Sequence, residues 1–319
     1  MAKVPAAFNF PVLEQSFDYK YNERELFIKR MNSISTFQEI TDIIKFFLDI
    51  FVVSIDIYLI IIVCRNPKLK MIKANKLIMH FSLFNILYTI SKPILTIFME
   101  IFDLWQHITL SFWCIQDEIE NSGLLGMFLT GLALSVNWLI TVNCKNVKQI
   151  FLKLNNNLII VIYVLISANL IGGFILCQIT YRNWSLLPQL IFLLLTIIFV
   201  IICDCKIKAD DNKKNYPLRI ANVVIMSWIP IILYLVLHAI FQNNYTVLFI
   251  LYVTLFIPEF IAYGSPITVI FTLYYINKNF KIAVRKSCCT NNGYGLENHF
   301  EDEGDESCTD DLENKAQLL

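Results

Sequence analysis

Four ionisable side chains stand out inside long apolar stretches of the sequence: Asp56, Lys92, Glu120 and Glu259. Charges in apolar surroundings are energetically costly, so each of these residues is a candidate site. A carboxylate in a low-dielectric pocket attracts a cationic group. Alternatively, Lys92 forms an interhelical ion pair with Glu120 or Glu259 that only holds the helices together. Both interpretations hold if Lys92 neutralises one acid and leaves the other for a ligand.

Seven apolar stretches are long enough to position these groups as membrane-spanning helices. About 20 mostly apolar residues cross a hydrocarbon core about 30 Å thick. Because each backbone N–H and C=O must find a partner within such a segment, long apolar runs without alternation predict helices rather than barrel strands. The sequence therefore predicts an all-α, seven-transmembrane helix bundle, with spans at 43–64, 76–99, 112–142, 157–178, 187–205, 220–241 and 247–276.

The composition favours a membrane protein and excludes other classes. Apolar residues make up 56% of the chain and charged residues 16%, against about 25% charged residues in soluble domains. The formal net charge of +0 excludes a globally basic nucleic-acid binder. The sequence contains no nucleophile elbow, metal-binding box or phosphate loop, so we expect neither an enzyme nor a bound cofactor.

The distribution of lysine and arginine predicts the orientation of the bundle. Basic residues cluster in the loops after spans 1, 3, 5 and 7, whereas the opposite loops hold only Arg182. The positive-inside rule then places the amino terminus outside the cell and the carboxyl terminus in the cytoplasm. Residues 1–42 become an extracellular tail, and two glycosylation sequons, at Asn183 and Asn244, fall in outer loops.

The segment after the last span predicts two further regions. Residues 277–289 place Phe280 and other apolar residues among four basic ones, which is typical of a short amphipathic helix on the inner leaflet. Cys288 and Cys289 at its end are candidates for S-palmitoylation. Residues 290–319 are acidic and poor in apolar groups, so we expect a disordered cytoplasmic tail.

Motif-like residues recur in a fixed order along the spans. They are Asp56 with Arg65 in span 1, Asn75, Asn85 and Pro93 in span 2, Cys114 and Ser135-Val136-Asn137-Trp138 in span 3, Ser227-Trp228-Ile229-Pro230 in span 6, and Ser265-Pro266 in span 7. In order and spacing, residues 42–289 resemble rhodopsin-like G-protein-coupled receptors. In span 1 the family has an Asn followed by a basic turn, and in span 2 it has Asn, Asp and Pro. Span 3 of the family has a Cys and Asp-Arg-Tyr, span 6 has Cys-Trp-x-Pro, and span 7 has Asn-Pro-x-x-Tyr. No motif is intact, and the eroded pattern is most similar to the divergent serpentine chemoreceptors of nematodes.

The resemblance implies a plasma-membrane receptor that binds an extracellular small-molecule or peptide ligand and signals to a heterotrimeric G protein. It implies a ligand cavity lined by Lys92, Trp228 and Glu259. Span 3 contributes Glu120 if positions are counted back from Asn137, or Asn121 if they are counted forward from Cys114. Cys114 stands at the family's disulfide position, and Cys177 is the only other cysteine near the outer surface. A disulfide between them would tie span 3 to the second outer loop. Asp117 and Glu118, at the outer mouth, are expected to be solvated.

The same resemblance assigns roles nearer the cytoplasm. Asp56, Asn85 and Ser265 stand in a polar cluster that rearranges on activation in the family, and we expect a protonatable Asp56 hydrogen-bonded to the other two. Asn137 and Trp138 stand at the inner-face positions that meet the G protein.

Two alternatives to a coupled receptor follow from the residues. Trp138 replaces the family's arginine and cannot form its charge-assisted bonds, which leaves a ligand-binding, receptor-like protein without G-protein coupling. The other alternative is a small transporter or ligand-gated channel, although the two halves of the chain show no repeat.

Overall fold

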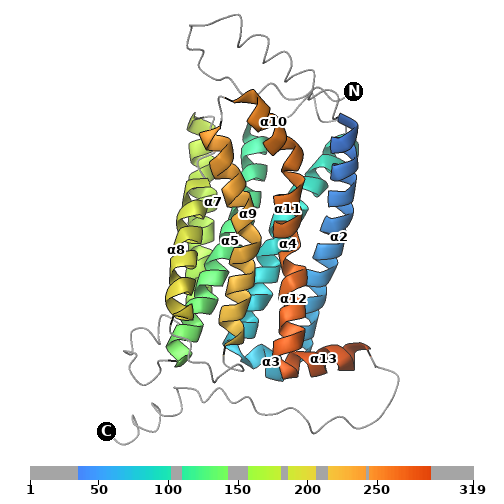
Figure 1. The fold of residues 1–319 in the computed structure, drawn as a ribbon. Helices are drawn as coiled ribbons and strands as arrows, with labels where there is room; N and C mark the ends of the chain where they lie inside the picture. The colour runs from blue at the N-terminus through green and yellow to red at the C-terminus, as the bar shows by residue number, and fades with distance from the viewer. Residues whose placement is uncertain are drawn as a thin grey trace, which may run out of the picture.

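The chain forms a bundle of helices in the computed structural model, which describes residues 35–101, 110–142, 157–180, 186–205, 215–241 and 244–288. The described residues contain no strand, so the all-α prediction is confirmed for this part of the chain. In chain order (Figure 1) the helices are α2 (Ser35–Arg65), α3 (Pro67–Met71), α4 (Lys73–Ile101), α5 (Leu110–Val142), α7 (Leu158–Thr180), α8 (Leu186–Asp204), α9 (Tyr216–Ile240), α10 (Tyr245–Thr254), α11 (Phe256–Tyr263), α12 (Ser265–Ile276) and α13 (Lys278–Cys288).

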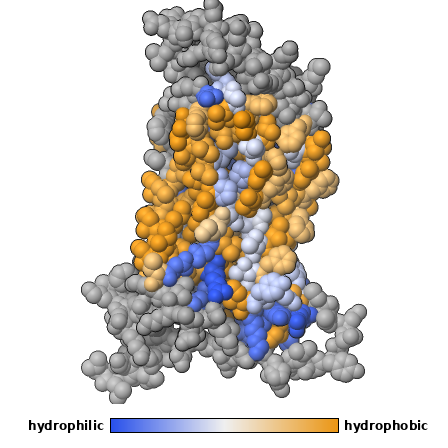
Figure 2. All heavy atoms as spheres, in the orientation of Figure 1, coloured by the Kyte–Doolittle hydropathy of each residue, from blue (hydrophilic) through white to orange (hydrophobic). Residues whose placement is uncertain are grey.

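The flanks of the bundle carry the apolar surface that lipid requires. Figure 2 shows hydrophobic residues covering the sides, with hydrophilic ones gathered toward the end where α13 lies. Within the described part of the chain, five segments are long and apolar enough to cross a membrane: Glu39–Arg65, Ser111–Thr141, Leu158–Ile179, Tyr216–His238 and Tyr245–Ile276. The apolar part of α8, Pro188–Asp204, is shorter. The protein is therefore a helical membrane protein.

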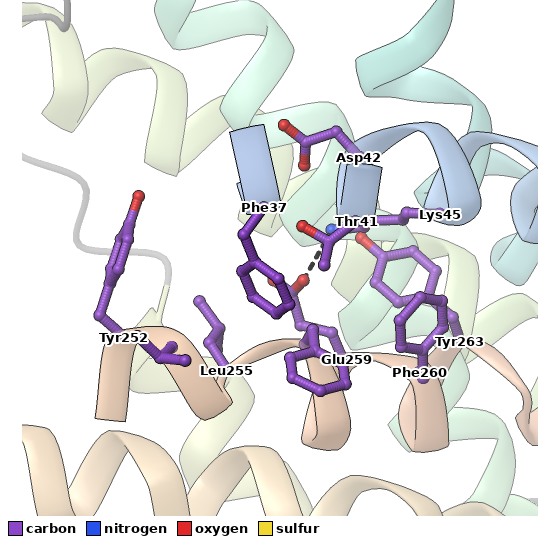
Figure 3. A pocket seen from close by; sticks show the side chains of 11 residues that line it. Phe37, Thr41, Asp42, Lys45, Tyr252, Leu255, Glu259, Phe260 and Tyr263 are labelled. Atoms are coloured by element: carbon purple, nitrogen blue, oxygen red, sulfur yellow. Dashed lines mark hydrogen bonds and ion pairs between the residues drawn. The ribbon is translucent and has the colours of Figure 1, made fainter. Parts of the chain in front are cut away.

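Helix α5 occupies the middle of the bundle. It packs against α4, α7, α8 and α9. The buried share of its apolar segment is 78%, whereas that of the apolar segment of α7 is 17%. Helix α2 begins at the end of the bundle where α10 lies, and α12 finishes at the opposite end, beside α13 (Figure 1). We refer to these as the α10 end and the α13 end. A cavity opens between α2, α10 and α11 at the α10 end (Figure 3).

Two helices begin well before the spans predicted for them. Every other start or end of a predicted span lies within three residues of the corresponding helix end. Helix α2 begins at Ser35 rather than at residue 43, because polar residues continue the helix beyond the apolar stretch that hydropathy detects. Helix α9 begins at Tyr216 rather than at residue 220. Pro217 lies in its first turn, where the missing N–H of proline leaves no helical bond unmade.

The predicted last span, 247–276, is divided into α10, α11 and α12, which meet at Leu255 and Gly264. Prolines explain both interruptions. Pro258 lies in the first turn of α11 and Pro266 in that of α12, and neither has an N–H to donate to the preceding turn. The middle piece, α11, is therefore a short helix bounded by a break at each end.

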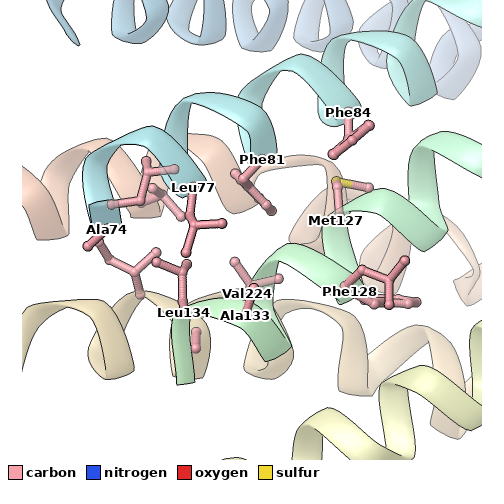
Figure 4. Packing of buried hydrophobic residues seen from close by; sticks show 14 of the residues in the cluster. Ala74, Leu77, Phe81, Phe84, Met127, Phe128, Ala133, Leu134 and Val224 are labelled. Atoms are coloured by element: carbon pink, nitrogen blue, oxygen red, sulfur yellow. The ribbon is translucent and has the colours of Figure 1, made fainter. Parts of the chain in front are cut away.

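Helices α4 and α5 approach closely because glycine lies where their backbones meet. Figure 4 shows Phe84 of α4 near Met127 of α5 in the buried core. A Cβ atom at Gly123 would lie 2.7 Å from the backbone nitrogen of Tyr88 and 2.9 Å from the carbonyl oxygen of Phe84. Backbone atoms cannot turn aside as a flexible side chain can, so this contact requires glycine.

We expect Gly123→Ala to destabilise the protein by about 1–3 kcal/mol, the usual cost of overpacking a core. The matched control is Gly172→Ala in α7, because a Cβ atom there meets nothing within 4 Å. Thermal unfolding of both variants in the same detergent measures the difference. An unchanged midpoint for Gly123→Ala would contradict the close approach of α4 and α5.

Candidate functional site

The cavity at the α10 end has a volume of about 260 Å³ and contains an ion pair (Figure 3). Lys45 Nζ on α2 donates to Glu259 Oε2 on α11 at 3.1 Å, and the two side chains are 22% and 31% exposed. Lys45 Nζ also lies 4.6 Å from the centre of the Tyr263 ring, within the range of a cation–π interaction. One cation therefore joins α2 to two residues that are one helical turn apart on α11.

The sequence predicts Lys92 as the cation that neutralises Glu120 or Glu259, whereas the partner of Glu259 in the structure is Lys45. Lys92 lies on α4, but its side chain is outside the described part of the structure, so its pairing stays a prediction. Lys45 lies just inside the first apolar stretch, at 43–64. The criterion that selected the other four ionisable residues, a charge within an apolar run, would have found it.

A row of aromatic rings connects the cavity to the core of the bundle. The ring centres of Tyr263 and Tyr88 are 5.4 Å apart, those of Tyr88 and Trp228 are 5.5 Å apart, and those of Trp228 and Phe128 are 5.6 Å apart. The hydroxyl groups of the two tyrosines interact, and Glu120 on α5 lies close enough to act on both electrostatically. The predicted ligand residues Glu120, Trp228 and Glu259 therefore lie along one aromatic row.

The two candidates for the inward position of span 3 face different neighbours. Glu120 acts electrostatically on Tyr88 of α4 and Tyr263 of α11. The side-chain oxygen and the carbonyl oxygen of Asn121 instead accept bonds from Gln189 Nε2 of α8, at 2.8 and 3.1 Å. Of the two, Glu120 is the one that shares electrostatic neighbours with Glu259.

The expectation that Glu118 is solvated is wrong. Its side chain is buried, with 1% exposed, and its carboxylate lies against Gly173 of α7. Glycine leaves room at that point for the carboxylate between α5 and α7. Asp117, its neighbour, is partly exposed.

The polar cluster near the middle of α2 and α4 is formed in part. Asn85 Nδ2 donates to Asp56 Oδ2 at 2.7 Å, and both residues are buried. Ser82, one turn before Asn85, lies beside the same carboxyl group. Ser265 is also fully buried, but its hydroxyl oxygen makes no hydrogen bond with the described residues. The predicted pairing of Asp56 with Asn85 is present, whereas that with Ser265 is not.

A second polar group lies at the α13 end. Trp138 Nε1 on α5 donates to Asn215 Oδ1, at the start of α9, at 2.9 Å. The adjacent Tyr216 Oη lies 3.4 Å from Asn75 Oδ1 of α4. Trp138 is 2% exposed, and Asn137 is also buried. Trp138 is therefore an uncharged contact between α5 and the start of α9.

The predicted disulfide is confirmed: Cys114 of α5 and Cys177 of α7 are bonded. Cys177 lies on the helix rather than in the loop after it, so the bond ties α5 to α7 directly. Asn244 is exposed and caps α10, since its side-chain oxygen accepts from the Val247 amide at 3.2 Å. Asn183, Cys289 and the side chain of Cys288 lie outside the described residues, and these modification sites stay predictions.

Helix α13 turns its apolar side to the bundle. Phe280 and Ala283 are buried, and α13 packs against α12 and α2. Asn277 begins the helix by accepting the Phe280 amide at 2.9 Å. The amphipathic pattern at 277–289 thus corresponds to a helix that docks on the protein, with Lys278 and Arg285 exposed.

Comparison with protein-family models finds no match, and comparison with curated proteins finds no similar sequence. The geometry described above is therefore the ground for a functional proposal. It consists of an ion-paired cavity at one end, an aromatic row through the core, and a hydrogen-bonded contact between α5 and α9 at the other end.

We expect Asp56→Ala to lower stability by about 1–3 kcal/mol, because it leaves the buried amide of Asn85 without its acceptor. Asp204→Ala is the matched control: Asp204 also accepts from an asparagine, Asn222, at 3.1 Å, but this pair is exposed. Asp56→Asn keeps an acceptor and should recover most of the loss. Thermal unfolding in detergent measures all three, and equal effects of the two alanine variants would contradict a buried bond.

Proposed function

We propose that the chain is a seven-transmembrane receptor of rhodopsin-like type in the plasma membrane, related to chemosensory receptors, with its amino terminus outside. In this proposal α4 and α8 cross the bilayer too, and α10, α11 and α12 make up one span. At about 1.5 Å per residue, the 29 residues of α4 and the 19 of α8 extend roughly 44 and 28 Å, against a hydrocarbon core of about 30 Å. An odd number of crossings agrees with α2 beginning and α12 finishing at opposite ends.

The observation that carries the proposal is the position of α5. This central helix is bonded to α7 through Cys114 and Cys177 at the α10 end, and it is hydrogen-bonded to α9 through Trp138 and Asn215 at the α13 end. A change in packing around α5 therefore has a direct path between the two faces of the membrane. A receptor needs such a path, whereas a transporter needs a continuous polar passage.

An extracellular ligand would act by preferring one of two arrangements of the bundle, since only differential affinity shifts an equilibrium. Its proposed contacts are Glu120, Trp228 and Glu259, which lie along the aromatic row. Pro230 interrupts the hydrogen bonding of α9 two residues after Trp228, so α9 is the natural helix to bend. Bending would separate Asn215 from Trp138 and open the α13 end to a heterotrimeric G protein.

The buried, uncharged state of Trp138 favours a second candidate function. A receptor-like protein that binds ligand without engaging a G protein has no need of an exposed cation at this position. The two functions share the ligand site and differ only at the α13 end.

The proposed topology predicts the accessibility of tags at the two termini. An amino-terminal epitope tag should bind antibody on intact cells, and a carboxyl-terminal tag should bind only after the membrane is permeabilised. Exposure of both tags on the same side of intact cells would contradict an odd number of spans and the receptor with it.

The contact between Trp138 and Asn215 predicts a change in basal signalling. We expect Trp138→Phe to raise ligand-independent second-messenger production up to about fivefold, because a hydrogen bond worth about 1 kcal/mol no longer holds α9 to α5. The control is Trp113→Phe, on the same helix but exposed. Equal basal levels in the two variants, at equal surface expression, would favour the receptor-like protein without coupling.

A further inference from the structure

The cavity at the α10 end has a chemical character that selects its ligand. Among the residues that the structure describes, three charged side chains line it: Asp42 and Lys45 of α2 and Glu259 of α11. Two carboxylates against one ammonium group leave a formal charge of −1. Because Lys45 is already 3.1 Å from Glu259, the excess negative charge lies with Asp42 and with the second oxygen of Glu259.

Aromatic rings surround this charged centre. Phe37 of α2, Tyr252 of α10, and Phe256, Phe260 and Tyr263 of α11 all line the cavity, and Figure 3 shows rings on both sides of the ion pair. The negative faces of aromatic rings attract cations, most strongly where water is scarce. Lys45 over the Tyr263 ring already uses this interaction inside the cavity.

From these observations we infer that the cavity between α2, α10 and α11 binds a small organic ammonium ion, whose cationic group lies between Asp42 and Glu259 and whose apolar body packs on the rings. An anionic ligand would meet two carboxylates. A neutral apolar ligand would leave the excess charge unmatched. The volume of about 260 Å³ is just under the roughly 300–1,000 Å³ of sites for drug-sized ligands, so the ion is small.

This position differs from the one that the sequence resemblance implies. The resemblance places Glu120 or Asn121 of α5 in the ligand cavity together with Glu259. The cavity in the structure keeps Glu259, but none of its described lining residues comes from α5, and its charges come from α2 and α11. The bound ion would compete with Lys45 for Glu259. Release of Lys45 would change the contact with Tyr263, the first ring of the aromatic row, so the inference gives the proposed receptor function a ligand class and an entry to the core.

The test measures binding of phenylethylammonium to the full-length protein in lipid nanodiscs, by calorimetry, with neutral 3-phenylpropanol and anionic 3-phenylpropanoate as comparison probes. We expect the cation to bind at least about tenfold more tightly than either comparison probe. Equal binding of the three probes, or no binding of the cation, would overturn the inference.

Paired variants test the place of binding. Glu259→Gln makes the cavity formally neutral and should weaken binding of the cation about tenfold, whereas Lys45→Gln removes the competing cation and should tighten it several-fold. A gain cannot result from misfolding, so Lys45→Gln remains informative if Glu259→Gln folds poorly. Asp42→Asn, at an exposed position, should also weaken binding.

Asp204→Asn is the matched control and should leave binding unchanged, because Asp204 is an exposed carboxylate of α8 outside the cavity lining. Glu120→Gln separates this cavity from a ligand site on α5, because Glu120 also lies outside the lining. Loss of binding in Glu120→Gln but not in Glu259→Gln would move the ligand to α5 and overturn the inference. The nanodisc measurement needs no G protein. Binding without second-messenger production in cells would therefore contradict the proposed function and leave the ammonium site intact. Signalling that Glu259→Gln does not change would support the proposed function and contradict the ammonium site.

Discussion

Hydrocarbon offers no hydrogen bonds, and this absence determines where the polar side chains of the protein lie. Each polar group in a span has to find a partner within the bundle or remain unpaired at considerable cost. Asp56 with Asn85, Asn121 with Gln189, and Trp138 with Asn215 are the result: each pair joins two different helices. The same interactions that satisfy polar atoms therefore fix how the helices rotate and pack around α5.

Much of the helical architecture follows from the sequence because hydropathy is a strong one-dimensional signal. A run of about 20 apolar residues predicts a helix without knowledge of its neighbours, and most boundaries were accurate for that reason. The disulfide of Cys114 and Cys177 was predictable because the orientation rule left one possible partner on the same side. Local prolines likewise account for the breaks in the last predicted span, although a hydropathy profile does not detect these breaks.

The candidate site was less predictable because it depends on the rotation of each helix about its axis. The sequence does not reveal that Lys45 of α2 reaches Glu259 of α11, more than two hundred residues later. Nor does it show that Gly173 of α7 leaves space for Glu118, which hydropathy assigns to the solvated mouth. Such pairs become evident only when the contacting faces are known, so sequence reasoning identified the relevant residue types more reliably than their partners.

The short helix α11 has a mechanical consequence of its own. It contains eight residues between interruptions at Leu255 and Gly264, and it carries both Glu259 and Tyr263 on one face, a single turn apart. A helix this short, interrupted at both ends, turns about its axis more readily than the same residues would within one continuous helix. A small twist of α11 about its axis would displace the acid and the ring in the same direction, so that electrostatic and aromatic contacts change in concert.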